Sequence, residues 1–121
     1  MPSVNVVFYR EEDGTVPVAD WLGRLPREAK IKCIDRLVRL KQLGHEMRRP
    51  ESDYLGDDLY ELRIRFQSVH YRMLYFFHGR TVAIIAHGLV KEREVPKREI
   101  DVALRRKERF AIDPVRHTSE E

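Results

Sequence analysis

Six of the basic side chains between residues 59 and 97 form a candidate set, and their residue types suit contact with phosphate groups. An arginine can make two parallel hydrogen bonds to a phosphate, and a lysine supplies a compact positive charge. The pattern indicates an anion site, and a nucleic-acid backbone is a polyanion that fits it. The six residues are Arg63, Arg65, Arg72, Lys91, Arg93 and Lys97.

These cations also have a purely structural interpretation. Charged side chains on the outer face of a strand keep an exposed surface soluble in most proteins. Arg72 differs from the others because its neighbours Tyr71, Met73 and Leu74 are apolar, and a buried cation costs free energy unless it has a partner. Glu61 could supply that partner. An anion site and a structural ion pair therefore both stay open for Arg72.

Histidines in the same region could exchange a proton near neutral pH. His70 is two residues from Arg72 and shares its face in a strand, and His87 ends a predicted strand beside Gly88. The histidines lack the helical spacing of a metal site, so we expect no metal. The sequence contains no P-loop, GxGxxG or GxSxG motif, which argues against a nucleotide cofactor and a serine hydrolase. We expect no cofactor.

Three strands are predicted to position these side chains. In Leu59–Phe66, Glu61, Arg63 and Arg65 alternate with apolar residues, so the two arginines lie on the face opposite the core. Residues 69–77 are almost continuously apolar, as in a central strand. Residues 81–87 form a third strand. The short connections between the three make an antiparallel meander the simplest arrangement.

The remaining elements are a strand before the meander, a helical hairpin and a final helix. Residues 4–9 form the N-terminal strand. Residues 18–25 and 27–43 form two amphipathic helices that together cover one sheet face. The apolar stripe of the second is Cys33, Ile34, Leu37, Leu40 and Leu43, and Gly44 closes it. Residues 45–58 form a connection, residues 87–95 a charged segment, and Pro96 opens the last helix.

The order of these elements predicts an α+β fold: an N-terminal strand, a helical hairpin, a three-stranded antiparallel meander and a C-terminal helix. We expect the helices to lie mainly on one face of a largely antiparallel sheet. The length of 121 residues suits one domain. We assign it to residues 1–110 and expect residues 111–121 to be a flexible tail.

Composition narrows the setting of this domain. The sequence has no apolar run long enough for a membrane span and no signal peptide, so we expect a cytoplasmic protein without a membrane partner. Cys33 is the single cysteine, which excludes an internal disulfide. The net charge is +3, and residues 59–121 carry thirteen Lys and Arg against nine Asp and Glu. The basic excess therefore lies in the meander and in the residues after it.

Four stretches of the sequence match a known pattern. They are Leu-Tyr-Glu-Leu-Arg at 59–63, Tyr-Arg-x-x-Tyr at 71–75, His-Gly followed by Lys91 at 87–91, and a proline before a final helix at 96–103. With the order of elements, these stretches resemble the phage-derived HigB-like branch of the RelE/ParE toxin superfamily, from type II toxin–antitoxin modules. The resemblance extends to about Phe110 and implies a RelE-like fold.

The resemblance also implies an activity and partners. Members of this superfamily cleave mRNA on the ribosome without a metal: the ribose 2′-hydroxyl attacks the adjacent phosphate, giving a cyclic phosphate and a 5′-hydroxyl end. The expected partners are the ribosome with its mRNA and a cognate antitoxin, often a helix-turn-helix protein. Alone, the chain is expected to be a monomer or a weak dimer.

Carried over by position, the resemblance makes Arg63, Arg72 and Lys91 the catalytic candidates. Because arginine stays protonated, the group that transfers a proton is sought among Lys91, Lys97, His70 and His87, and Lys91 is favoured. The RNA-binding candidates are Arg65, His70, His87, Arg93 and Lys97. The chain departs from better-known members in two ways. No tyrosine follows Tyr75, so the catalytic tyrosine that some carry near the C-terminus has no equivalent, and Glu61 stands where RelE has a basic residue.

The same fold also serves other functions. A ParE-like toxin binds and poisons DNA gyrase and needs no catalytic cations, and a non-toxic remnant would only bind its antitoxin. The basic cluster favours RNA cleavage, but fold alone does not decide function.

Overall fold

The computed structural model describes residues 3–120 of the chain. The first two residues of the predicted domain and the last residue of the predicted tail lie outside that range. In chain order the elements are β1 (Asn5–Tyr9), α1 (Pro17–Gly23), α2 (Arg27–Leu43), a 3-10 helix (Gly44–Glu46), β2 (Ser52–Gly56), β3 (Leu59–Phe66), β4 (Val69–His78), β5 (Val82–Val90), α3 (Lys97–Ile112) and β6 (Thr118–Ser119).

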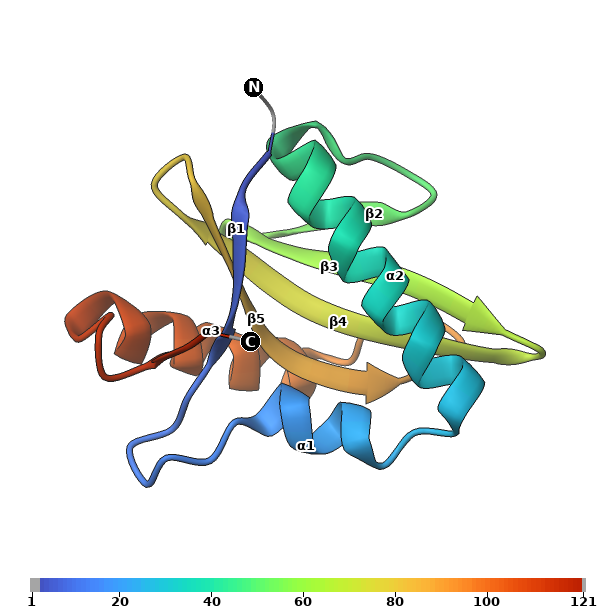
Figure 1. Cartoon of the computed structure of the whole chain (residues 1–121), viewed down its shortest axis with the longest axis horizontal. Helices are drawn as coiled ribbons and strands as arrows, with labels where there is room; N and C mark the ends of the chain where they lie inside the picture. The colour runs from blue at the N-terminus through green and yellow to red at the C-terminus, as the bar shows by residue number, and fades with distance from the viewer. Residues whose placement is uncertain (1–2, 121) are drawn as a thin grey trace.

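Within the described residues, the strands form one sheet in the order β2-β3-β4-β5-β1-β6 (Figure 1). The pairs β3–β4 and β4–β5 are antiparallel, which confirms the predicted meander. β1 pairs parallel with β5 and antiparallel with β6, so the sheet is mixed. A parallel pair needs a long crossover connection, and here the helical hairpin and the first part of the meander provide it.

The sequence predicted four strands, whereas the described residues form a sheet of six. β2 lies in the segment predicted as a connection, and β6 lies in the predicted tail. β2 is a polar edge strand that pairs only with β3, so its sequence lacks the apolar alternation that marks a half-buried strand. The third meander strand also extends beyond the predicted His87, through Gly88, to Val90.

The helices cover both faces of the sheet. Residues of α1 and α2, such as Val18 and Leu37, share one core cluster with Leu62 of β3. Residues of α3, such as Phe110, share a second cluster with Phe76 of β4. The expectation that the helices lie mainly on one face is right for the hairpin and wrong for α3. Coverage of both faces explains why β4 is almost continuously apolar.

The buried stripe of α2 is narrower than the sequence predicted. Its buried residues are Ala29, Cys33, Leu37 and Leu40. Ile34, which was expected in the core stripe, is 42% exposed. The apolar residues of α2 span a wider arc than the sheet can cover, so one side of the helix stays uncovered.

The segment predicted as a flexible tail makes defined contacts as far as Ser119. α3 continues to Ile112, and β6 pairs with Phe8 and Tyr9 of β1. The ring of His117 is buried and stacks on Tyr9 with 5.2 Å between centroids. Among the described residues, no helix is both long and apolar enough to cross a membrane.

Gly88 of β5 leaves no space for a larger residue. A β carbon at this position would lie 2.3 Å from Cδ2 of Trp21 on α1. We expect Gly88→Ala to destabilise the fold by about 1–3 kcal/mol, because overpacking forces side chains or backbone to shift. Urea unfolding followed by circular dichroism measures the change. Gly23→Ala is the matched control, since nothing lies within 4 Å of its added β carbon; equal stability of the two variants would contradict the prediction.

Burial of Cys33 makes stability depend on alkaline pH. The side chain is fully buried, and desolvation raises its thiol pKa from 9.0 to about 11. The unfolded chain therefore loses this proton first, so the contribution is complete below pH 9 and is lost as the pH rises toward 11. Unfolding free energies measured below pH 9 and near pH 11 should differ less in Cys33→Ala than in the wild type. An unchanged difference would contradict this assignment.

Candidate functional site

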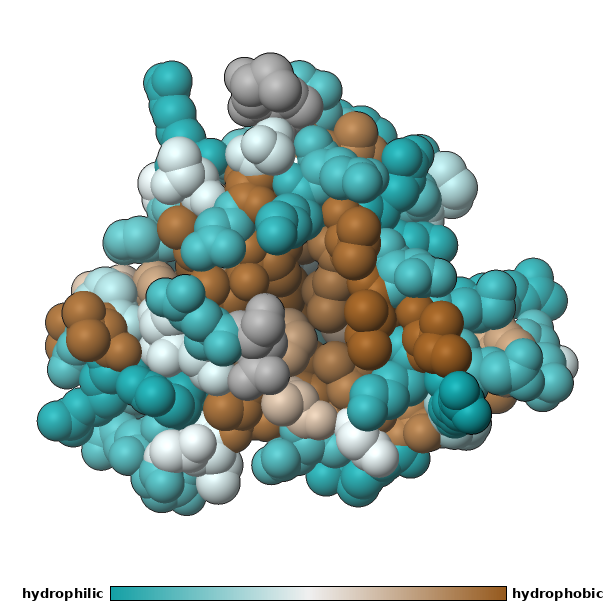
Figure 2. Space-filling view, in the orientation of Figure 1, coloured by the Kyte–Doolittle hydropathy of each residue, from teal (hydrophilic) through white to brown (hydrophobic). Residues whose placement is uncertain are grey.

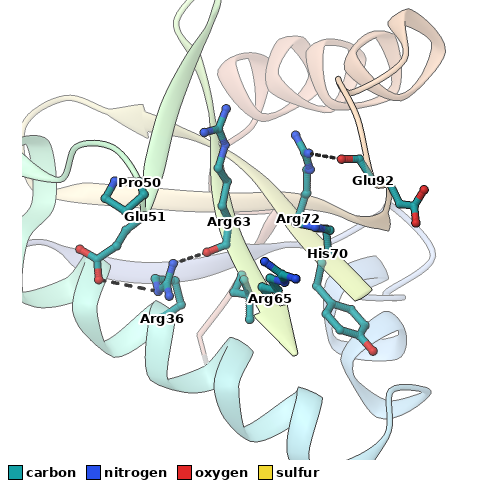
Figure 3. Close-up of a pocket in the computed structure, with 10 residues that line it drawn as sticks. Arg36, Pro50, Glu51, Arg63, Arg65, His70, Arg72 and Glu92 are labelled. Atoms are coloured by element: carbon teal, nitrogen blue, oxygen red, sulfur yellow. Dashed lines mark hydrogen bonds and ion pairs between the residues drawn. The ribbon is translucent and has the colours of Figure 1, made fainter. Parts of the chain in front are cut away.

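The pairing of β3 with β4 brings two of the predicted arginines directly opposite each other. Arg63 pairs with Arg72, and Arg65 pairs with His70 at the hairpin end of the same two strands. Because side chains opposite each other in a sheet point to the same face, all four lie on one side. Figure 3 shows the side chains of Arg63 and Arg72 extending in parallel from their strands.

A buried carboxylate holds this arginine pair together. Glu61 is 2% exposed, and each of its oxygens accepts from a different guanidinium. Oε1 lies 2.8 Å from Nη1 of Arg72, and Oε2 lies 3.2 Å from Nη2 of Arg63. Arg63 also donates to Asp53 of β2 at 3.0 Å. The carboxylates of Glu61 and Asp53 thus hold the two guanidinium groups side by side. Glu61 is the ion-pair partner of Arg72, as one of the two interpretations of Arg72 proposed.

The two arginines differ in exposure. The Arg63 side chain is 38% exposed, whereas that of Arg72 is 10% exposed. Arg72 makes one further contact, a long 3.5 Å bond from Nη2 to the backbone oxygen of Glu92. The Nε atoms of both arginines are buried and have no hydrogen-bond partner in the described part of the chain. The pair therefore keeps unused donor groups, and Arg63 is the member that a ligand can reach.

A pocket of about 460 Å³ opens beside this pair. Arg36 of α2 forms another wall, and its Nη1 donates to the backbone oxygen of Arg63. Figure 3 shows Glu51 and Pro50 at one side of the pocket and Glu92 at the other. The lining residues are Arg36, Pro50, Glu51, Arg63, Ile64, Arg65, His70, Tyr71, Arg72 and Glu92. Four arginines, a histidine and two glutamates thus line the opening, and Glu61 and Asp53 pair with Arg72 and Arg63 behind it.

Two carboxylates near the pocket are held in their ionised forms. A hydrogen bond from Arg39 lowers the pKa of Glu51, and a hydrogen bond from Arg49 lowers the pKa of Asp53. Charge on Arg36 and Arg63 acts in the same direction. Both carboxylates therefore remain negative at neutral pH and hold the arginines around them in place.

The pocket collects four of the eight predicted site residues: Arg63, Arg65, His70 and Arg72. Lys91 is exposed and lies beside the pocket, since its backbone nitrogen donates to the carbonyl of His70 at 3.1 Å. Arg93 is exposed in the segment between β5 and α3, outside the lining. Lys97 lies at the start of α3, where it pairs with Asp101 at 3.1 Å.

His87 does not line the pocket, and two side chains of α3 bond its ring nitrogens. Its Nε2 lies 2.6 Å from Glu99, and Nη1 of Arg106 lies 3.2 Å from its Nδ1. Arg106 can only donate, so Nδ1 accepts and Nε2 carries the proton that is donated to Glu99. The structure places His87 apart from the other RNA-binding candidates of the pocket, because α3 packs over β5 and its side chains bond both ring nitrogens; a role of His87 in RNA binding stays a prediction.

Sequence reasoning missed Arg36, Glu51, Asp53 and Glu92. Arg36 lies on α2 outside the apolar stripe, and nothing distinguishes it from the other cations of that helix. Glu51 and Asp53 fall in the segment predicted as a connection. Their role depends on the pairing of β2 with β3, which has no signal in the local pattern. Within residues 3–120, no group of three or more His, Cys, Asp or Glu side chains is placed to hold a metal ion.

One protein-family model matches the chain. Its description is "Phage derived protein Gp49-like (DUF891)", and the match covers residues 20–108. That range includes α1 except for its first turn, the whole meander and most of α3, so every pocket residue lies inside it. A search of curated proteins found no match.

Proposed function

Since the chain belongs to the Gp49-like family, a family in the RelE/HigB-like group of toxins from toxin–antitoxin pairs, we propose that it is a toxin that cleaves messenger RNA. A toxin of this group has an antitoxin partner. The observation that carries the proposal is the pair Arg63–Arg72, held by Glu61 at the edge of an open pocket. Cleavage on the ribosome is part of the proposal and is supported by the family alone.

The pair suits a phosphate that gains negative charge during reaction. In the proposed step the 2′-oxygen of a ribose attacks the adjacent phosphorus, and the bond from phosphorus to the 5′-oxygen of the next nucleotide breaks. The products are a 2′,3′-cyclic phosphate and a 5′-hydroxyl end. Charge builds up on the phosphoryl oxygens midway, and fixed guanidinium groups stabilise it without having to reorganise. Only RNA has the attacking hydroxyl, so DNA is not a substrate.

Two protons must move in this step. One leaves the 2′-hydroxyl, and another joins the departing 5′-oxygen. Arginine stays protonated, so it serves neither purpose. His70 lines the pocket opposite Arg65, and Lys91 lies beside it on the neighbouring chain segment. Because His70 lines the pocket and Lys91 does not, we assign proton transfer to His70 and leave Lys91 as a cation at the rim.

His70→Ala is expected to lower the cleavage rate by about tenfold or more, because a group that moves a proton in the transition state is lost. Lys91→Ala should have a smaller effect. Single-turnover cleavage of a reporter mRNA measures both, and added imidazole should restore part of the rate of His70→Ala. The control is His78→Ala, at the opposite end of β4. If Lys91→Ala is the more damaging change, proton transfer belongs to Lys91.

The proposed function is tested by adding the protein to translating ribosomes and mapping the 5′ ends of the mRNA. We expect new ends with a 5′-hydroxyl, at positions in phase with codons. The same mRNA without ribosomes shows whether the ribosome is needed. Absence of new ends, together with DNA breaks that depend on gyrase, would replace the RNase proposal with a gyrase-directed toxin. Growth that continues under induced expression would indicate that the chain only binds its antitoxin.

A further inference from the structure

α2 carries a second apolar stripe that the sheet does not cover. Ile31, Ile34 and Val38 follow one another at the spacing of one helix face, and they are 46%, 42% and 48% exposed. Single exposed apolar residues are common on soluble proteins, but a row of three large ones on one helix is a typical mark of an interaction surface. The stripe borders a cavity, which strengthens this interpretation.

The cavity is a groove of about 470 Å³ between α2 and β1, with α1 beside it. Its apolar lining includes Val6 and Phe8 of β1 and Leu22 of α1, and Ile34 and Val38 form the wall on the α2 side. Figure 2 shows a continuous apolar area over this part of the molecule, between β1 and α2. An apolar area of this kind, rimmed by polar side chains, fits a partner better than it fits solvent.

The charges around the groove have one sign. Lys30 and Lys41 are the charged residues that line it, and no carboxylate does. α2 as a whole carries six Lys and Arg against two Asp and Glu. Of these six cations, Arg36 and Arg39 form ion pairs with Glu51. Lys30 and Lys41 make no ion pair in the described part of the chain. Eleven residues separate the two lysines, which places them about 16 Å apart along the helix axis, or three turns.

We propose that this groove binds an amphipathic helix of a partner protein, with an apolar stripe over Ile34 and Val38 and acidic side chains toward Lys30 and Lys41. Helices recognised in grooves present apolar residues at i, i+3 or i+4 and i+7, a span of about two turns that fits between Lys30 and Lys41. A second copy of this chain is disfavoured as occupant, because pairing α2 with itself would bring like charges together. The identity of the partner rests on the proposed function, under which the antitoxin supplies this helix.

The groove and the arginine pocket lie on different sides of α2 and share no lining residue. Arg36 faces the pocket, whereas Ile34 and Val38 face the groove. A helix bound in the groove therefore leaves the arginine pocket open. Partner binding at the groove and RNA binding at the pocket are expected not to compete directly.

The probe for this inference is a synthetic peptide of about five helical turns, with leucines along one face and glutamates flanking them. Fluorescence anisotropy should detect saturable binding to the wild-type chain. Ile34→Glu and Val38→Glu should each weaken it by about tenfold or more, because each places a carboxylate in the apolar wall. Replacing Lys30 and Lys41 together by glutamate should weaken it as well, and should favour a peptide with lysine flanks.

Two controls keep the result specific. A scrambled peptide of the same composition tests the need for the apolar face, and Ile112→Glu adds the same charge at an apolar residue of α3 that is 84% exposed and outside the groove. Equal binding of the scrambled peptide, or unchanged binding by Ile34→Glu and Val38→Glu, would overturn the proposal. A wild-type dimer that Ile34→Glu dissociates would instead assign the groove to a second copy. RNA cleavage by Ile34→Glu should equal that of the wild type. The cleavage assay therefore tests the nuclease proposal separately from the peptide-binding assay, which tests the groove.

Discussion

We expect Arg63→Ala to lower the rate of RNA cleavage by about a hundredfold, the usual effect of removing one fixed donor that stabilises transition-state charge. Arg63 is the more exposed member of the pair, and its Nη2 atom serves both Asp53 and Glu61. Nε is buried, so Nη1 is the remaining donor group that a bound phosphate can use. Arg63→Lys keeps the charge but loses the fork of donors, so its rate should lie between those of Arg63→Ala and the wild type.

The measurement is single-turnover cleavage of a ribosome-bound reporter, alongside urea unfolding of each variant. Arg80→Ala is the matched control, because Arg80 is an exposed arginine in the turn beyond the far end of β4. It should cleave like the wild type. Arg63→Ala should remain folded, since Glu61 keeps its bond to Arg72. A rate for Arg63→Ala within twofold of the control would remove Arg63 from the site.

Glu61→Leu is expected to destabilise the fold by about 3–5 kcal/mol, because it leaves a buried guanidinium without its carboxylate. Among the residues that the structure describes, Arg72 would then keep only the long contact to the backbone of Glu92, with a side chain that is 10% exposed. A small domain is stable by about 5–15 kcal/mol, so this loss is a large share of the total. Urea unfolding followed by circular dichroism measures the change.

The double variant Glu61→Leu with Arg72→Met separates the buried charge from the loss of packing. Replacing a buried ion pair with apolar residues of similar volume is often neutral or stabilising. The double variant should therefore recover most of the stability lost by Glu61→Leu while cleaving poorly, since Arg72 is missing. If Glu61→Leu unfolds within about 1 kcal/mol of the wild type, the carboxylate does not hold the pair. Arg72→Ala alone is a poor test of catalysis, because it leaves Glu61 with one guanidinium fewer in a buried place.

The central part of the site could be predicted from the alternation of charged and apolar residues in β3 and from the short turn between β3 and β4. Glu61, Arg63 and Arg65 alternate with apolar residues in β3, and two residues join β3 to β4. With so short a turn the register has little freedom, which places Arg72 opposite Arg63 and His70 opposite Arg65. This part of the site depends on local pattern, which a sequence displays directly.

The other parts depend on contacts between distant segments. Asp53 reaches Arg63 only because β2 pairs with β3, and β2 is a polar edge strand without apolar alternation. His87 was placed among the RNA-binding residues because it ends a predicted strand beside Gly88, but Glu99 and Arg106 of α3 bond both of its ring nitrogens. The position of α3 on the second sheet face has no local signal. Ile34 was expected in the core for a similar reason: an apolar stripe does not say how much of it the sheet will cover.

The parallel pairing of β1 with β5 has a consequence for the order of folding. Asn5 pairs with Val82, so β1 cannot pair with β5 until the residues of β5 have been made. The hairpin of β3 and β4 closes a short loop and can form first, since local contacts cost less chain entropy. Arg63 and Arg72 belong to that hairpin, whereas Val6 and Phe8 of β1 line the groove proposed for the partner helix. During synthesis, the two arginines are therefore expected to come together before the groove is complete.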